Sequence, residues 1–504
     1  IVADIIDPHS PSLEDAAAKA RALARYAGEP HAITLGPSDH TACAPLSFAL
    51  RLAIPAGCTA AQLAKRISLA AAGRWTDLLA IPFPSGGRPR SDPPQRARHF
   101  MLAGNHRKAL AALSGPTARV DDYTQQVHVL FPAEPPAPDG AQPPRPPPDK
   151  AEAEAALVSL LRRQNTSIDQ LVSEAIARMA PLSQPGPSGL RKEHLRLAWD
   201  TIPTFPELFS ALIRRIVVGD LCGELVTRST LSLVPKPGGG CRPIGVGEVV
   251  RRIAGRIVAS GITPAVRSTF EQGKQYVLSQ FGTALAYRRI LRLATSRKWI
   301  LQVDLRNAFN EVSRAAVIRH APSEALAGPI IETLYAQPSL MMIPRLAVAR
   351  AIDRGVIQGC PLGSLLFAAA LQPIADAAGR DLPVEQTWYA DDGHIAAEDV
   401  THLETYLSRF ATLAEQSGLR LSFGPTKTRL LSPQPVAPLS AEAFPSLAAL
   451  PLTHQITSLG GPVVSMAHAD RAAAVQAAWE ALVDGVAAKI APIGTMLAPP
   501  HMIS

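Results

Sequence analysis

The chain has 504 residues, with 50 Lys and Arg against 42 Asp and Glu and a formal charge of +8. A hydrophobic content of 47% excludes a wholly disordered chain, and the lack of a run of ~18 apolar residues argues against a membrane span. The five cysteines are scattered, without a CxxC pair or a Cys/His cluster. We therefore expect neither a disulfide framework nor a zinc site, and a reducing intracellular compartment, nuclear or cytoplasmic.

Proline marks two irregular segments in the first third of the chain. The 47 prolines amount to about 9% of the sequence against a usual ~5%, and they concentrate at 82–94 and 132–148. Because proline lacks an N–H and fixes φ, the second segment predicts a polyproline II linker, with a surface loop as the alternative. We expect a helical N-terminal extension over 1–130, built from Ala-rich stretches, and a linker over 131–150.

Basic residues concentrate after the linker. Residues 231–300 contain 12 Lys and Arg, against Glu248 and Glu271 as the only acids. Several of these bases lie in the helix-like stretch GEVVRRIAGRIVASGI and could form an ordinary solvated face, although such a face normally mixes signs. A stretch of one sign is more typical of contact with a nucleic-acid phosphate backbone.

One acid follows a predicted strand. Residues 298–305, KWILQVDL, indicate a strand, and the next segment, NAFNEVSRAAVIRHA, has helical periodicity, so Asp304 falls between strand and helix. Strand ends are where ligands bind in open α/β sheets. Alternation predicts that Ile300, Gln302 and Asp304 share one face. Taken alone, Asp304 could equally be a helix cap.

Two adjacent acids lie in a predicted hairpin, QTWYADDGHIA, at 386–396. Aromatic and apolar residues flank Asp391 and Asp392, and Gly393 follows them. Since adjacent strand residues point to opposite faces, we expect Asp391 to lie nearer to Asp304, with Asp392 more peripheral. Carboxylates held close together repel, and two Mg²⁺ ions roughly 3.5–4 Å apart would remove that repulsion. For the two acids in isolation, a surface hairpin is the alternative.

Seven segments, in order, resemble the motifs of the reverse transcriptase family, especially those of non-LTR retrotransposons. They are PGPSGLRKEHLR at 185–196, LSLVPKPGGGCRPIGV at 231–246, VDLRNAFNEV at 303–312, GVIQGCPLGSLLF at 355–367, YADD at 389–392, GLRLSFGPTKTRL at 418–430 and ITSLGGPV at 456–463. YADD alone is weak evidence, whereas the ordered series is strong. We recognise no endonuclease constellation, Cys/His knuckle or ribonuclease H domain beside it.

The resemblance implies an α+β fold, the right-hand polymerase. Fingers would occupy 151–298, a palm with the catalytic carboxylates 299–464, and a truncated thumb 465–504. The implied activity is that of an RNA-directed DNA polymerase, which adds dNTPs to a primer 3′-OH by two-metal nucleotidyl transfer. The implied partners are an RNA template, a DNA primer and dNTPs, with no membrane. The implied cofactors are two Mg²⁺ ions, with Mn²⁺ as an alternative.

The resemblance also assigns catalytic roles to four residues. Asp304, Asp391 and Asp392 match the family's catalytic carboxylates and would be the metal ligands. Lys427 matches a lysine that would act as a general acid toward pyrophosphate. An exposed surface lysine is the plain alternative for Lys427.

Further residues would bind the incoming dNTP. Lys236 and Arg242 match the triphosphate clamp, in which an arginine can bind two phosphate oxygens at once. Phe309 matches an aromatic steric gate, whose ring leaves no room for a ribose 2′-OH. Judged alone, the clamp segment would be a Pro-Gly-rich hairpin loop and Phe309 a core residue. The other implied dNTP contacts are Gln358, Gly359 and Tyr389.

Two other functions stay open. A catalytically inactive or domesticated nucleic-acid-binding remnant would fit the short stretch after Val463, but it predicts damaged carboxylates, and all three are present. An RNA-directed RNA polymerase is disfavoured by Phe309 and by the Tyr-Ala pair in front of the two acids. Asn310 stands where the family often has a second Asp, a change that we expect to be tolerated.

Overall fold

The computed structural model describes residues 149–221, 224–235, 241–296, 298–343, 348–434, 438–465 and 471–497, together with 130–132 and a few isolated positions before them. The predicted helical extension over 1–130 and the linker over 131–150 therefore lie almost entirely outside the described residues. Lys236 lies outside them as well.

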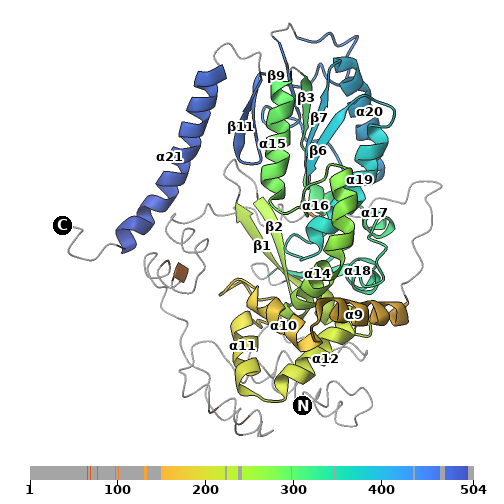
Figure 1. Ribbon diagram of the computed structural model, residues 1–504, viewed down its shortest axis with the longest axis vertical. Coiled ribbons are helices and arrows are strands. Elements are labelled where there is room, and N and C mark those ends of the chain that lie inside the picture. The colour runs from red at the N-terminus through yellow and green to blue at the C-terminus, as the bar shows by residue number, and fades with distance from the viewer. Residues whose placement is uncertain are drawn as a thin grey trace.

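The described chain mixes helices and strands, as the α+β prediction requires (Figure 1). Its helices are α9 (Lys150–Gln164), α10 (Ile168–Ala177), α11 (Lys192–Thr201), α12 (Phe205–Val217), α13 (Glu224–Thr227), α14 (Val249–Gln272), α15 (Gly282–Thr295), α16 (Ala308–Glu311), α17 (Arg314–Arg319), α18 (Gly328–Tyr335), α19 (Gly363–Ala378), α20 (Val400–Gln416) and α21 (Arg471–Leu497). Its strands are β1 (Ser229–Pro235), β2 (Cys241–Gly247), β3 (Trp299–Val303), β4 (Ser339–Ile343), β5 (Val348–Ile352), β6 (Glu385–Tyr389), β7 (Asp392–Ala397), β8 (Arg429–Leu431), β9 (Leu452–Thr453), β10 (Gln455–Ser458) and β11 (Gly461–Val464).

A four-stranded sheet joins segments far apart in the sequence, in the order β2-β1-β4-β5. β1 and β2 form an antiparallel hairpin, and β1 also pairs in parallel with β4 through Ser229↔Met341. The hairpin β4–β5 comes from the predicted palm range, whereas β1–β2 comes from the predicted fingers range. The sheet therefore crosses the boundary predicted at 298/299.

The second sheet has the strand order β6-β7-β3-β8-β9 and carries the predicted acids at one end. Leu301 and Val303 of β3 pack in the main hydrophobic core with residues of α19 and α20. Ile300 packs on the opposite face, with residues of α15 and the β10–β11 hairpin. The predicted alternation along β3 is therefore confirmed, and the face that holds Ile300 is also the face of Asp304.

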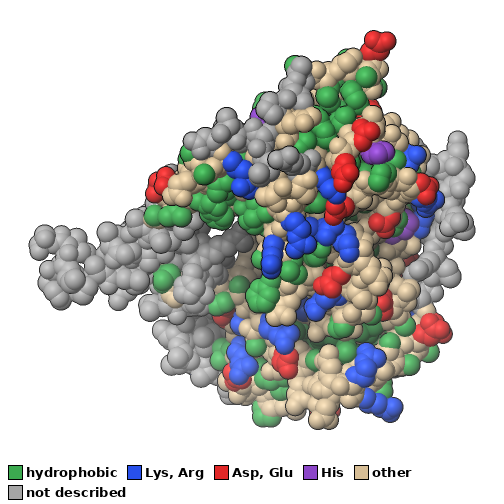
Figure 2. Space-filling model, turned by 45° about the horizontal axis from the view of Figure 1, so that its top comes forward, with side chains coloured by type: hydrophobic (Ala, Val, Ile, Leu, Met, Phe, Trp, Pro, Cys, Tyr) green, Lys and Arg blue, Asp and Glu red, His purple; other side chains and the backbone are tan. Residues whose placement is uncertain are grey.

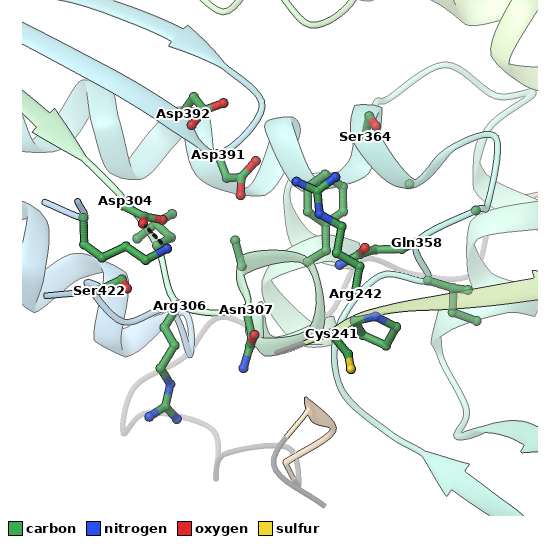
Figure 3. Close-up of a pocket in the computed structure, with 18 of the residues that line it drawn as sticks. Cys241, Arg242, Asp304, Arg306, Asn307, Gln358, Ser364, Asp391, Asp392 and Ser422 are labelled. Atoms are coloured by element: carbon green, nitrogen blue, oxygen red, sulfur yellow. Dashed lines mark ion pairs between the residues drawn. The ribbon is translucent and has the colours of Figure 1, made fainter. Parts of the chain in front are cut away.

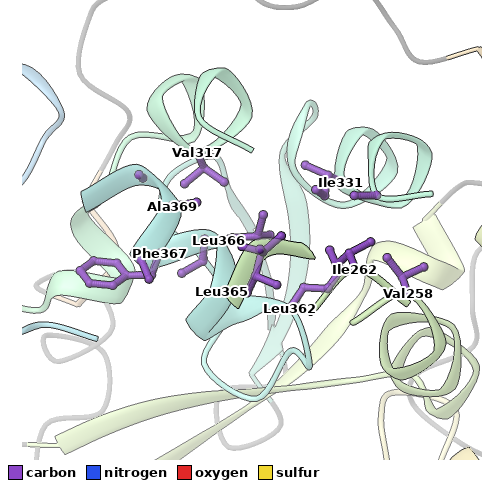
Figure 4. Packing of buried hydrophobic residues seen from close by; sticks show 14 of the residues in the cluster. Val258, Ile262, Val317, Ile331, Leu362, Leu365, Leu366, Phe367 and Ala369 are labelled. Atoms are coloured by element: carbon purple, nitrogen blue, oxygen red, sulfur yellow. The ribbon is translucent and has the colours of Figure 1, made fainter. Parts of the chain in front are cut away.

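Helix α19 lies at the centre of the main core. Its buried residues include Leu365, Leu366 and Phe367, which pack close to Val258 of α14 and Val317 of α17 (Figure 4). Burying a large apolar side chain contributes roughly 1.5–3 kcal/mol, so this helix fixes α14 and α17 relative to the five-stranded sheet. Helices α9 to α12 lie together at the lower end of Figure 1, where α10 and α12 pack against α14.

The helix predicted after Asp304 is broken into two. α16 ends at Glu311, Val312 is extended with ψ 132°, and α17 begins at Arg314. The Ser313 side chain accepts a hydrogen bond from Ala316 N at 3.4 Å and caps α17. Gly355 N donates to Val312 O at 2.9 Å, so the break also connects to the segment before α19.

One long helix, α21, occupies most of the range predicted as a truncated thumb. It follows the β10–β11 hairpin, packs against β11 and extends away from the rest of the described chain in Figure 1. No helix in the described part of the chain is long and apolar enough to cross a membrane. Cys241 and Cys360, the two cysteines in that part, are free thiols.

Candidate active site

The predicted motifs meet around one cavity of ≈ 680 Å³ (Figure 3). The acids after β3 and in the β6–β7 turn lie on one side of it, and Arg242 and Gln358 lie on the other. Among the described site residues, Tyr389 is the one outside the lining; its ring lies beside Gly282 at the start of α15. The predicted site residues that line the cavity are Arg242, Asp304, Phe309, Gln358, Gly359, Asp391, Asp392 and Lys427.

Asp304 is fixed through its backbone by the loop before β8. Asp304 N donates to Thr428 Oγ1 at 3.2 Å, Thr428 Oγ1 donates to Asp304 O at 3.3 Å, and Ser422 N donates to Asp304 O at 2.8 Å. Lys427 Nζ lies 2.8 Å from Asp304 Oδ2, and both side chains are accessible from the cavity. The loop thus positions the acid and also places a cation on its carboxylate.

The β6–β7 turn decides how the two adjacent acids are placed. Tyr389 pairs with Asp392, so the turn consists of Ala390 and Asp391, and Ala390 has a φ of 52°. The β3–β7 ladder ends at Val303↔Gly393, which places Asp392 across from Asp304 in register. Asp392 is the exposed acid of the two, which agrees with its expected peripheral position, and Asp391 lines the cavity from the turn.

The three carboxylates influence one another electrostatically. The pKa of Asp392 is raised to about 6, first because the surrounding protein removes water from the carboxyl group and then because Asp391 and Asp304 repel its charge. Arg242 and Lys427 act in the opposite direction. The Asp392 side chain is exposed at the edge of the cavity, so solvent moderates this shift.

The chemistry of these donors fits a hard divalent cation. Carboxylate oxygens are the ligands that Mg²⁺ prefers, and a cation among them would relieve the repulsion that raises the pKa of Asp392. Within the described residues, no three His, Cys, Asp or Glu side chains form a complete metal site by themselves. Mg²⁺ usually takes its other ligands from water and substrate phosphates, so a partial set of protein ligands is consistent with it.

The opposite wall is built from β2 and the loop before α19. Gly245 N of β2 donates to Gln358 O at 2.8 Å, which fixes that loop to the strand. Gly359 has a φ of +108°, and a Cβ there would lie 2.8 Å from Gly245 O, so only glycine fits without a shift. The exposed Arg242 side chain, also on β2, extends toward Asp391 in Figure 3.

Phe309 forms a supported wall of the cavity. Its ring stacks on Phe367 with centroids 4.6 Å apart and planes 18° apart, while the residue remains partly exposed in the lining. Val356 N donates to Phe309 O at 2.7 Å. The ring therefore has one face against the core of α19 and cannot swing away from the cavity without losing that packing.

Glu311 lies behind the site, and no sequence signal marked it. Its carboxylate is fully buried and accepts from Arg306 Nε at 3.0 Å and from Arg420 Nε at 3.1 Å. Arg306 lines the cavity, and both arginines are about half exposed, at 49% and 48%. Glu311 thus holds two cations beside the site through contacts that local spacing could not reveal.

His394 shares a strand face with Asp392 but does not titrate near neutral pH. It is 1% exposed, and its two ring nitrogens have no hydrogen-bond partner among the described residues. Burial, and to a smaller extent the charge of Arg429, lower its pKa to about 3. A neutral His394 is therefore excluded as an acid at physiological pH.

Comparison with known families identifies the domain that contains this cavity. Residues 234–460 match the family described as reverse transcriptase (RNA-dependent DNA polymerase). This chain carries a reverse transcriptase domain. All eight site residues that line the cavity fall inside the matched range.

Two curated relatives belong to transposable elements. The chain is 24% identical over 288 residues to the transposon TX1 uncharacterized 149 kDa protein of Xenopus laevis, covering 51% of this chain and 21% of that protein. It is 24% identical over 327 residues to the retrotransposable element SLACS 132 kDa protein of Trypanosoma brucei gambiense, covering 62% of this chain and 24% of that protein. The reverse transcriptase domain is of the non-LTR retrotransposon type, and the chain spans a quarter or less of either relative's length.

A second, cationic cavity of ≈ 530 Å³ lies between α10, which precedes the matched range, and α14, which lies within it, and shares Gly359 with the first. Its lining includes Arg252 and Arg256, one turn apart on α14, and Arg178, which pairs with Glu174 at 3.0 Å. Burial lowers the pKa of Arg252 and of Arg256. Arg252 Nε and Nη2 and Arg256 Nε have no hydrogen-bond partner in the described structure.

Proposed function

We propose that this chain is an RNA-directed DNA polymerase of a non-LTR retrotransposon, which joins a dNTP to a primer 3′-OH on an RNA template. The observation that supports this proposal is the composition of one cavity within the reverse transcriptase domain. Three carboxylates from two strand ends face Arg242, and Lys427 lies on the same side as Asp304. Nucleotidyl transfer needs this combination, because catalysis of phosphoryl transfer rests on positioning and charge neutralisation.

Asp304, Asp391 and Asp392 would hold two Mg²⁺ ions, with Mn²⁺ as an alternative; the ions would activate the primer 3′-OH and neutralise the leaving pyrophosphate. Asp304 reaches the cavity from a strand end whose backbone is fixed by Thr428. Rigid placement of these acids serves the reaction, because the reacting oxygens must be held in line.

The triphosphate would bind against Arg242, whose planar guanidinium can hold two phosphate oxygens at once. Lys236, in the neighbouring segment, would complete this clamp. Lys427 Nζ, 2.8 Å from Asp304 Oδ2, is the ammonium group placed to exchange that carboxylate for pyrophosphate and to donate a proton to it. The resemblance to the family implies this role, and the position of Lys427 in the lining next to the acids supports it.

Selection of the sugar and base would fall to the opposite wall. Phe309, held by its stack on Phe367, would exclude a 2′-OH because it offers the hydroxyl neither space nor a partner. Gln358 and Gly359, fixed to β2, would contact the nucleotide and the template. Tyr389 lies outside the lining, so its part in dNTP binding would be indirect, through the turn that follows it.

The cationic cavity would bind phosphates of the template strand. It shares Gly359 with the cavity lined by Asp304, Asp391 and Asp392, which we call the catalytic cavity. A strand whose base lies at Gly359 could therefore pass from one cavity to the other. Arg252 and Arg256 have buried N–H groups without partners in the described structure, and a phosphate would supply acceptors for them. On the face shown in Figure 2, Lys and Arg side chains gather near the middle, as a polyanion-binding surface requires.

A primer-extension assay tests the proposed function. The purified chain should extend a DNA primer on an RNA template with dNTPs and Mg²⁺, and EDTA should stop the extension. Asp391→Asn should abolish extension while thermal unfolding and primer–template binding stay as in the unmodified chain. Equal background extension by both proteins would reject catalysis by this cavity, and binding without extension would support a non-enzymatic remnant instead.

A further inference from the structure

One side chain from outside the five-stranded sheet holds the turn that carries Asp391. α14 ends at Gln272, and Gln275 then forms a parallel β-bridge with Trp388 of β6. Gln275 Oε1 accepts a hydrogen bond from Ala390 N at 2.9 Å, and Gln275 Nε2 donates to Ala390 O at 3.2 Å. A single amide thus pairs with both backbone polar groups of one turn residue.

The amide is itself held rigidly. Trp388 N donates to Lys274 O at 2.9 Å, and Tyr276 N donates to Trp388 O at 2.9 Å, so backbone bonds flank Gln275 on both sides. Gln275 is 1% exposed, and its Oε1 also accepts from Val277 N at 3.3 Å. It does not belong to the residues that line the catalytic cavity. Gln275 is therefore placed to act on the turn and not on the substrate.

The backbone of Ala390 needs a hydrogen-bond partner such as Gln275. Ala390 has a φ of 52°, in the left-handed region that a residue with a Cβ rarely adopts. It is also buried, at 7% exposure, so its N–H and C=O must find partners within the protein. The Ala390 C=O belongs to the same peptide as Asp391 N, and the direction of that peptide sets where the Asp391 side chain begins.

We propose that Gln275 is a positioning residue, which fixes the peptide between Ala390 and Asp391 and thereby aims Asp391 and Asp392 into the catalytic cavity. Its kinetic consequences rest on the proposed polymerase function. The contact also couples the end of α14, the helix of the cationic cavity, to the catalytic turn. A donor and an acceptor are needed at the same point, and an uncharged primary amide supplies both.

Substitution of Gln275 should lower the rate of the chemical step. In Gln275→Leu both contacts to Ala390 are lost, and in Gln275→Glu the ionised carboxylate can accept from Ala390 N but cannot donate to Ala390 O. Because a misplacement of ~1 Å can cost about 100-fold, we expect kcat to fall roughly 10- to 100-fold in both variants. The Kd for primer–template should stay unchanged, and the Mg²⁺ concentration for half-maximal rate should rise.

Gln372→Leu is the matched control. Gln372 is also a buried glutamine, and its Nε2 donates to Gly273 O at 3.0 Å, so it binds the same segment two residues before Gln275 without touching the turn. We expect Gln372→Leu to lower thermal stability about as much as Gln275→Leu does, with a much smaller change in kcat. Equal losses of kcat in the two folded variants would overturn the proposal.

Amide hydrogen exchange provides a readout that does not depend on activity. The Ala390 N–H, which donates to Gln275, should exchange faster in Gln275→Leu and at the unmodified rate in Gln372→Leu. If the unmodified chain fails to extend primers, this measurement still tests the contact between Gln275 and Ala390. Failure of the proposed polymerase function can therefore be distinguished from failure of the proposed role of Gln275. Unchanged exchange at Ala390 in Gln275→Leu rejects the proposed role of Gln275. Should that variant not fold, Gln275→Met, which also removes both contacts to Ala390, takes its place in the measurement.

Discussion

The catalytic cavity and the cationic cavity share Gly359 but hold their charges in opposite ways. The acids of the first are short side chains on a strand end and a tight turn, where hydrogen bonds to the backbone of Asp304 and of Ala390, the residue before Asp391, fix the chain. The arginines of the second are long side chains on neighbouring turns of one helix, with N–H groups that lack partners among the described residues. The two cavities therefore show two uses of charge. In the first, each charge must lie at a defined point, whereas in the second the summed positive charge matters more than the position of any one group.

These two arrangements should respond differently to substitution. Removing a rigidly placed acid should change the rate of chemistry by orders of magnitude, because the reacting atoms depend on its position. Removing one of these arginines should change affinity by a modest factor that depends on salt, because phosphate contacts along a strand add up. The following predictions test that contrast, beginning with the largest expected effect.

Asp304→Asn should lower kcat on the order of 10³-fold, because it removes a charged ligand from the site of phosphoryl transfer. Single-turnover extension with saturating dNTP measures this change. Asp376→Asn is the control, since Asp376 lies on α19 outside the catalytic lining and accepts from Gln372 Nε2 at 2.7 Å. If both variants keep the unmodified rate, the rigid acids are not the catalytic element and the contrast fails.

Phe309→Ala should shift sugar selection without a comparable loss of dNTP turnover. Opening the space that the ring occupies should raise the ratio of rNTP to dNTP incorporation by roughly 10- to 100-fold, the usual range for a single steric or apolar discrimination. Parallel extension with the two nucleotide types measures the ratio. Phe309→Tyr keeps the ring and should keep the discrimination. An unchanged ratio in Phe309→Ala would assign the ring to the core alone.

The Mg²⁺ requirement should rise at low pH. The pKa of Asp392 is raised to about 6, so this carboxylate is ionised above pH 6 and becomes protonated as the pH falls through that value. Protons then compete with the metal, and the apparent Mg²⁺ affinity should fall about tenfold for each pH unit below the pKa. Extension at several Mg²⁺ concentrations between pH 5 and 7.5 measures this change, with primer–template Kd as the control. A flat Mg²⁺ requirement across that range contradicts the assignment.

Sequence patterns predicted the elements of the site better than their contacts. The strand before Asp304 and the YADD hairpin are confirmed, because alternation and turn composition are local properties. The peripheral position predicted for Asp392 agrees with its exposed side chain, whereas the length of the turn, two residues, was not predicted. Local spacing did not reveal the partners of the acids, since Thr428 lies 124 residues from Asp304 and Gln275 lies 115 residues from Ala390.

The double variant Arg252→Gln/Arg256→Gln should show the smallest effect, and that effect should appear in the salt dependence of primer–template binding. We expect primer–template affinity to fall several-fold and the slope of log K against log salt to decrease by roughly 1.4, about 0.7 for each phosphate contact with a single strand. Titrations at several salt concentrations measure this slope, on templates with and without an unpaired 5′ extension.

Arg380→Gln/Arg409→Gln, with both arginines exposed near α20, is the control and should leave the slope unchanged. Because these arginines act on binding, kcat at saturating template should stay the same. A large loss of kcat with an unchanged salt slope would place Arg252 and Arg256 among the geometrically positioned residues and remove the contrast between the two cavities.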